Sequence, residues 1–329
     1  MQADAPGGIS APATRPRPGP SLLAPSTARD PYRLYRLLRE RHPLSYDAPL
    51  NVWLVSRYAD VVTALTDPRF TGLPHDAAPR PGPAPLGLCH GGPQCADPRP
   101  PGTAPDPRAT PPDDRTAARI ERTAYVLARR IAARRQADLV EEFCRWLPLG
   151  AATGTGPGRC PDRLGHSPCT RHTALRTTAL ASFLAHVLDA PDLLAALRTE
   201  PALADPAWAE SLRRDPPVQV VLRRTATEVT LDGGTLPAGA HVACLTGSAG
   251  RDPDRFAAPD LFDPFRTDQD RVLTGPESCP AVRLGRTEAR LGLCALLDAM
   301  PRLRWADGFR PARTGLLTRG PRTLLVSSG

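Results

Sequence analysis

The chain has 329 residues, which is enough to bury a large core as one big domain or two small ones. Its 41% hydrophobic content excludes a chain that is disordered throughout, and no apolar run approaches the roughly 20 residues of a membrane-spanning helix. The net charge is +8, and all 42 basic residues are arginine. Aromatic residues make up only 5% of the chain, and the arginines are scattered among acids, so the composition argues against nucleic-acid binding.

Residues 1–29 are rich in Pro and Gly and show no hydrophobic period, so we expect a disordered lead-in there. They also lack the apolar core of a signal peptide, and we therefore expect a cytoplasmic protein with no membrane segment. Cysteines stay reduced in that compartment. Four cysteines have spacings that match no familiar zinc pattern, so free thiols are favoured over a metal site: Cys89, Cys95, Cys160 and Cys169.

The first regular elements are expected directly after the lead-in. A helix begins at Asp30-Pro31, because Asp can cap a helix and Pro fits its first position. Two short strands at 45–46 and 52–55 follow, and then a helix at 58–65. Residues 71–112 hold 13 of the 41 prolines and show neither period, which predicts a long irregular segment.

Helical patterns dominate the rest of the chain. We expect helices at 114–135, 139–147, 173–188, 191–198 and 281–299, with a second Pro/Gly-rich break at 150–170. We expect strands at 218–222, 228–231, 241–245, 316–317 and 323–326, with turn signals between the first three. The predicted fold class is therefore mainly α with a small antiparallel β part, in a single domain over 30–329.

Glu210 and Arg213 lie three residues apart on one predicted helix face, where a carboxylate and a guanidinium can pair. Residues 251–266 read RDPDRFAAPDLFDPFR, and Cys279 precedes the helix that contains Leu284, Arg286 and Glu288. Together with DPYRLYRLLRERHPLSYDAPLNVWLVSRYADVVTALTDPRF near the beginning, these segments resemble, in the same order, the bacterial cytochromes P-450. Members of that family are heme-thiolate monooxygenases. The resemblance covers about 30–70 and 172–329.

The resemblance implies a truncated cytochrome P-450 fold and assigns roles to particular residues. Arg266 would join Glu210 and Arg213 in a buried Glu–Arg–Arg cluster with a structural task. Cys279 would be the axial ligand of heme iron, in a loop with Gly275. Arg224, or its neighbour Arg223, would meet a heme propionate, although an ordinary surface strand arginine is an equal interpretation.

Several family features are altered. Val272 stands where a Phe normally shields the thiolate, and Glu277 stands where a His or Arg meets a propionate. Prolines prevent a regular helix near 90–115, where the family has a propionate-binding helix. Thr177 and Thr178 are out of register with the family's oxygen-activating Thr, and no acidic neighbour precedes them. The helices that roof the substrate pocket are replaced by 150–170, so water would enter the site.

These departures favour a noncatalytic protein without a cofactor. They resemble the P-450-derived glycosyltransferase activators of macrolide and anthracycline clusters, which bind and stabilise a sugar transferase. A glycosyltransferase of the same pathway is thus the expected partner, with the amphipathic helices at 114–147 as the expected contact region. The alternatives are a heme-dependent monooxygenase that uses Cys279 as axial ligand of heme b and a ferredoxin as electron donor, and a relic without function.

Overall fold

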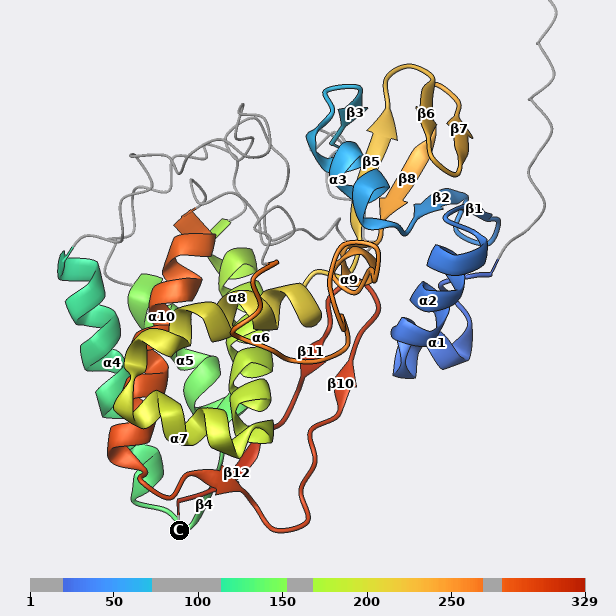
Figure 1. Cartoon of the computed structure of the whole chain (residues 1–329). Helices are drawn as coiled ribbons and strands as arrows, with labels where there is room; N and C mark the ends of the chain where they lie inside the picture. Colours follow the sequence, from blue (N-terminus) through green and yellow to red (C-terminus); the bar gives the residue numbers. More distant parts are fainter. Residues whose placement is uncertain (1–19, 73–113, 153–167, 269–279, 329) are drawn as a thin grey trace, which may run out of the picture.

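The computed structural model describes residues 20–72, 114–152, 168–268 and 280–328, which form a helical part and a β-rich part (Figure 1). The helical part contains α4 (Asp114–Ala132), a π-turn (Val140–Cys144), α5 (Trp146–Ala152), α6 (Pro168–Asp189), α7 (Pro191–Thr199), a 3-10 turn (Pro201–Leu203), α8 (Ala204–Arg214) and α10 (Pro280–Ala299). The β-rich part contains α1 (Pro25–Arg29), α2 (Pro31–Arg41), α3 (Tyr58–Thr66) and α9 (Thr246–Ala249).

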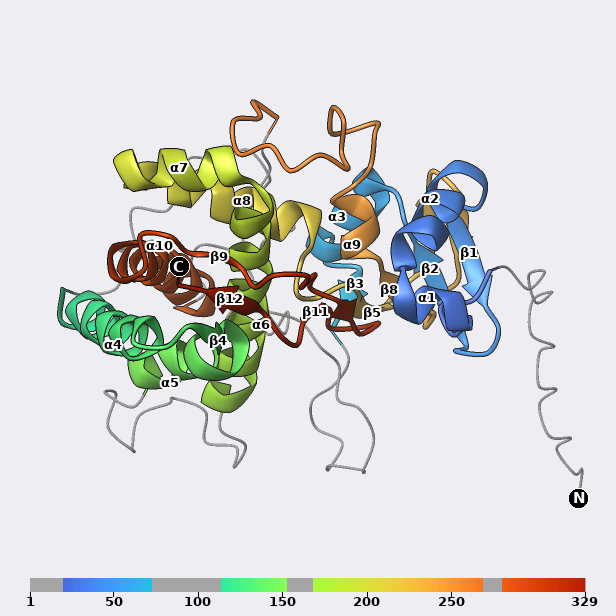
Figure 2. The ribbon, with the colours of Figure 1, turned by 90° about the horizontal axis from the view of Figure 1, so that it is seen from below.

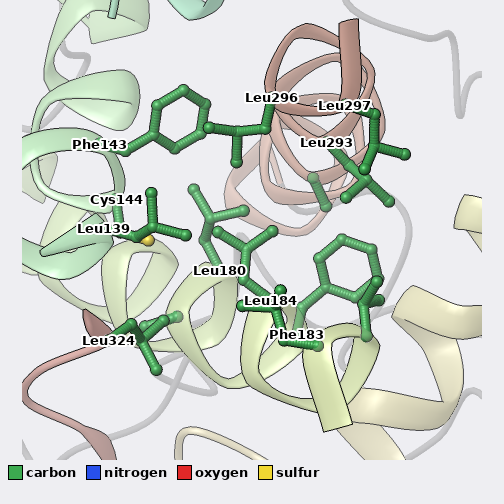
Figure 3. Packing of buried hydrophobic residues seen from close by; sticks show 14 of the residues in the cluster. Leu139, Phe143, Cys144, Leu180, Phe183, Leu184, Leu293, Leu296, Leu297 and Leu324 are labelled. Atoms are coloured by element: carbon green, nitrogen blue, oxygen red, sulfur yellow. The ribbon is translucent and has the colours of Figure 1, made fainter. Parts of the chain in front are cut away.

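The core of the helical part forms around α6. Every residue from 179 to 188 is buried, so this helix is covered by neighbours on all sides, as a helix without a polar face requires. Leu180, Phe183 and Leu184 lie between the π-turn and α10 (Figure 3). Gly292 lets α10 approach α5 closely, because a Cβ at this position would lie only 2.9 Å from Cδ2 of Leu147 in α5.

The largest sheet has the strand order β1-β2-β8-β5-β3, and only the β2–β8 pair is parallel. Its strands are β1 (Leu44–Asp47), β2 (Val52–Val55), β8 (His241–Cys244), β5 (Val221–Thr225) and β3 (Phe70–Thr71). The smaller sheets are β6 (Val229–Leu231) with β7 (Gly234–Leu236), β4 (Gln136–Asp138) with β12 (Leu325–Ser327) and β9 (Arg304–Trp305), and β10 (Arg313–Thr314) with β11 (Gly320–Pro321). The predicted fold class is confirmed.

Two of the predicted strands, at 218–222 and 316–317, differ from the structure. The strand predicted at 218–222 begins only at Val221, because the backbone N–H of Gln219 donates to the Leu317 carbonyl and leaves the sheet. Leu317 in turn lies between β10 and β11 and is not in a strand. These residues serve to tie the C-terminal segment to the end of α8.

The edges of the predicted irregular segments also differ from the structure. Residues 20–29 of the predicted lead-in are part of the fold, since Leu22 is buried and its N–H donates to Asp47 Oδ2 at 2.7 Å. Both ends of the break predicted for 150–170 are helical, because α5 continues to Ala152 and α6 begins at Pro168, and residues 153–167 lie outside the described residues. Nearly all of the segment predicted for 71–112 lies outside the described residues.

Within the described ranges, no single helix is long and apolar enough to cross a bilayer. The pair Thr173–Asp189 and Pro191–Thr199 meets the length and composition test only when both helices, bent by 102°, are counted together.

Truncation of Leu296 tests the α6–α10 core. Leu296 is fully buried, so Leu296→Ala should lower the free energy of unfolding by about 2–5 kcal/mol through lost burial and a residual cavity. Leu261→Ala is the matched control, because Leu261 is 63% exposed and should change stability by less than about 0.5 kcal/mol. Urea titration measures both, and equal losses would contradict this description of the core.

Candidate functional site

The structure brings Glu210, Arg213 and Arg266 together in a buried cluster at the end of α8. Arg213 donates from Nε and Nη2 to the two oxygens of Glu210, each at 2.7 Å. Arg266 donates from Nε to Glu210 Oε2 at 2.9 Å, and the Asp263 N–H donates to Oε1 at 2.9 Å. The carboxylate thus receives four donors, which offsets its desolvation.

The remaining donors of this cluster hold the segment 250–266 against α8. Arg213 donates to the carbonyls of Gly250, Pro259 and Leu261. Its guanidinium also lies 5.2 Å from the centre of the Phe256 ring. Through these hydrogen bonds the cluster joins α8 to the segment 250–266.

A second buried network is centred on Asp215, and no motif in the sequence predicted it. His186 of α6 bonds Asp215 Oδ2 through Nε2 at 2.7 Å and Ser211 Oγ through Nδ1 at 2.9 Å. Arg251 Nη2 donates to Asp215 Oδ1 at 2.8 Å, and the Tyr32 hydroxyl donates to the same oxygen. The network therefore joins α2, α6, α8 and the segment after α9.

The order Ser211–His186–Asp215 is that of a nucleophile, a base and an orienting acid. However, the exposed fractions are 0%, 1% and 5%, so no substrate can reach the hydroxyl. Burial lowers the pKa of His186, although Asp215 opposes this shift. Burial would raise the pKa of Asp215, but the hydrogen bond from His186 and the charge of Arg251 hold it well below its usual range.

A third buried pair joins α6 and α10. Arg176 donates from Nη1 to Glu288, and both side chains are at least 95% buried. Burial raises the pKa of Glu288 to about 7, and Arg176 only partly opposes this. Among the described residues, Arg176 Nε and Glu288 Oε2 have no hydrogen-bond partner, so each side chain of the pair keeps one buried polar atom without a hydrogen bond.

Of the residues that the family resemblance assigns to heme, the structure describes the arginines of β5 but not the cysteine loop. Gly275 and Cys279 lie outside the described residues. Arg224 is exposed on β5 and donates from Nε to the Gly239 carbonyl at 3.3 Å.

The described side chains of α6 also do not fit an oxygen-activating arrangement. Thr178 Oγ1 donates back to the Ala174 carbonyl, and its methyl group faces Gly320 of β11. The single acidic residue of α6, Asp189, lies at its C-terminal end and accepts a hydrogen bond from Trp305. Toward α10, the helix presents Arg176.

A cavity of about 400 Å³ lies between α2 and the segment 251–260, but its charges neutralise one another. Arg36, Arg57 and Arg251 pair with aspartates, and Arg39 donates to Ser248. Among the described residues, no three His, Cys, Asp or Glu side chains could hold a metal ion together. The side chains of Cys89, Cys95, Cys160 and Cys169 are not described.

Removal of the Glu210 charge tests the first cluster. Glu210→Gln leaves the shape but removes the counter-charge of two buried arginines, so the free energy of unfolding should fall by about 3–5 kcal/mol. Asp307→Asn, which breaks the exposed Arg304–Asp307 pair, should change little. Denaturant titration measures the difference, and similar small losses in both variants would contradict a structural role.

The shifted pKa values of His186 and Glu288 predict opposite effects of pH on the free energy of unfolding, and these effects partly cancel in the native chain. The pKa of His186 is lowered in the folded chain, so the folded chain binds a proton there less readily than the unfolded chain, and this group destabilises the fold as the pH falls below about 6.5. The folded chain keeps a proton on Glu288 up to about 7 and the unfolded chain releases it above 4.5, so this group destabilises the fold as the pH rises.

Variants should separate the two effects between about pH 5 and about pH 6.5. Glu288→Gln should become more stable with rising pH, and His186→Gln should become less stable, each by up to ~1.4 kcal/mol per pH unit. Urea titrations at several pH values measure the slopes. Slopes of the same sign in both variants would show that the assigned protonation states are wrong.

Comparisons with known proteins agree with this fold. The sequence profile of the cytochrome P450 family matches residues 177–299. Protein DesVIII of Streptomyces venezuelae is 39% identical over 185 residues, which are 55% of this chain and 44% of that protein. Pulcherriminic acid synthase of Bacillus subtilis is 31% identical over 160 residues, which are 45% of this chain and 40% of that protein. The chain thus matches less than half of the length of these relatives.

Solved structures extend the likeness beyond the matched segment. Substrate-free CYP109E1 from Bacillus megaterium superimposes with a TM-score of 0.72 over 91% of this chain and 99% of that chain, at 20% identity. CalO2 superimposes with a TM-score of 0.68 over 93% of this chain and 98% of that chain, at 23% identity. The chain therefore has the cytochrome P450 fold, and its residues 177–299 match the sequence profile of that family.

Proposed function

We propose that the chain is a noncatalytic auxiliary protein that binds and stabilises a glycosyltransferase in the biosynthesis of a polyketide antibiotic. The observation that carries this proposal is the face of α6 toward α10. Arg176 is buried there in an ion pair with Glu288, and the acid of the helix, Asp189, lies at its far end. A proton relay to bound oxygen needs an acid and a hydroxyl on this helix, close to the reacting group.

The sequence departures support the same function. Val272 and Glu277 replace residues that protect a heme thiolate and bind a propionate in the family, and the chain resembles P-450-derived glycosyltransferase activators in these losses. The similarity to Protein DesVIII, a name that assigns no oxygenase activity, is compatible with the proposal. The buried Glu210 and Asp215 networks keep the fold intact, which a binding protein requires.

A heme-thiolate monooxygenase is the second candidate, because the chain retains Cys279 and Gly275 and its relatives include named cytochromes P450 such as 105C1 of Streptomyces sp. In this candidate Cys279 would supply the iron ligand and a ferredoxin the electrons. Heme would supply oxygen activation, while the described residues would contribute the scaffold alone.

Co-expression with a glycosyltransferase of the same pathway tests the proposed function. We expect more soluble transferase and a higher turnover with the chain than without it, because an auxiliary protein stabilises the folded transferase by binding it. Cys279→Ser should stimulate the transferase as well as the native chain does. Unchanged transferase solubility and turnover in the presence of the native chain would refute the proposal.

An absorption spectrum of the purified chain with added hemin, dithionite and carbon monoxide separates the two candidates. The noncatalytic function predicts no thiolate-type Soret band. A band that appears in the native chain and vanishes in Cys279→Ser would instead support the monooxygenase.

A further inference from the structure

The outer face of α4 carries arginines that form no ion pair with a described residue. Residues 114–135 contain seven arginines and two acids. Ile120, Ala124, Ala128 and Ile131 are buried on the inner side of the helix, toward α10 and α5. Figures 1 and 2 both show α4 at the rim of the helical part, with no described element on its outer side.

Three arginines form a stripe along this outer face. Arg115, Arg122 and Arg129 follow one another at seven-residue spacing, which places them on one side of the helix, and all three are exposed. None of them forms an ion pair with a described residue, and Arg129 only approaches the Tyr125 ring, with its guanidinium carbon 6.0 Å from the ring centre. Two other exposed arginines nearby are neutralised, since Arg134 pairs with Glu142 and Arg145 pairs with Glu141.

Two exposed apolar side chains accompany the stripe. Val126 is 63% exposed and lies within the outer face, between Arg122 and Arg129. Trp146 of α5 is 54% exposed and precedes Gly150 by one helical turn, so it lies on the same side of α5 as Gly150. A Cβ at Gly150 would lie 2.7 Å from Thr123 Cγ2, which shows that this side of α5 rests against α4.

We propose that the α4 stripe, consisting of Arg115, Arg122, Val126, Arg129 and Trp146, is the docking surface for an acidic face of the partner protein. This inference rests on the proposed function and specifies the surface that the glycosyltransferase contacts. Carboxylates of the partner would pair with the arginines, and an apolar pocket would receive Trp146. Trp and Arg are the residues that most often dominate binding energy at protein interfaces.

The pattern fits a protein better than a nucleic acid. A surface that follows a phosphate backbone combines many basic residues with several aromatic rings. Here Val126 lies between two of the arginines and a single exposed Trp lies on the neighbouring α5, and protein interfaces ordinarily combine apolar side chains with charged ones in this way.

Charge reversal on α4 tests the docking surface. We compare the Arg115→Glu, Arg122→Glu, Arg129→Glu triple variant with a control of equal charge change, Arg33→Glu, Arg41→Glu, Arg302→Glu, whose residues are exposed elsewhere. The affinity for the purified transferase is measured by biolayer interferometry at about 50 mM and about 300 mM salt. The α4 variant should bind at least ~10-fold more weakly at low salt and lose most of the salt dependence, while the control retains both.

Trp146→Ala provides a second variant that should remain folded, because the side chain is exposed. It should weaken binding about 30-fold at both salt concentrations, whereas Leu261→Ala, an exposed apolar control, should not. If the triple variant melts at a lower temperature than the native chain, Trp146→Ala and the single Arg122→Glu variant decide the question.

Each remaining outcome counts against the inference. Native affinity in both the α4 variants and Trp146→Ala would overturn the docking surface and leave the proposed function standing. A native chain that fails to bind the transferase would overturn both. Binding of native chain to random duplex DNA as tightly as to the transferase would replace the acidic protein surface by a phosphate backbone.

Discussion

The fold depends on two buried carboxylates at the junction of its helical and β-rich parts. Glu210 on α8 and Asp215 just after it each accept several charged or polar donors. A buried carboxylate is costly unless such donors replace water, and the donors come from segments far apart in the chain. Glu210 thereby fixes the segment 250–266, and Asp215 fixes α2 and α6, so the junction forms only when these segments meet.

Under the proposed noncatalytic function, this constraint accounts for the retained cytochrome P450 fold. The donors to Glu210 and Asp215 are protein groups, and neither network contains a residue that the family resemblance assigns to heme. The Arg176–Glu288 pair likewise joins α6 to α10 directly. Selection on the folded state alone would preserve these contacts, whereas loss of a proton relay on α6 would leave them untouched.

The contacts between residues close together in the chain could be predicted from the sequence. The spacing of Glu210 and Arg213 defines a pair on one helix face, but Arg266 is 56 residues away and could be assigned only through a family resemblance. His186 and Asp215 are 29 residues apart, and a histidine within an apolar helix does not reveal its partner. The same reason explains why residues 20–29 were not predicted to belong to the fold. Leu22 donates to Asp47, and the hydrophobic pattern of the sequence does not show that these two residues lie side by side.

The use of charge inside the molecule also gives meaning to the charge outside it. A chain whose basic residues are all arginine has many guanidinium groups that need acceptors, and at Arg213, Arg251 and Arg266 carboxylates and carbonyls accept their hydrogen bonds in the interior. Compositional bias can explain why a basic residue is arginine, but it does not explain a seven-residue register. On α4 that register leaves three arginines aligned and exposed, without an acidic partner among the described residues. The same physical rule that pairs arginines with carboxylates in the interior therefore points to carboxylates on the surface that α4 meets.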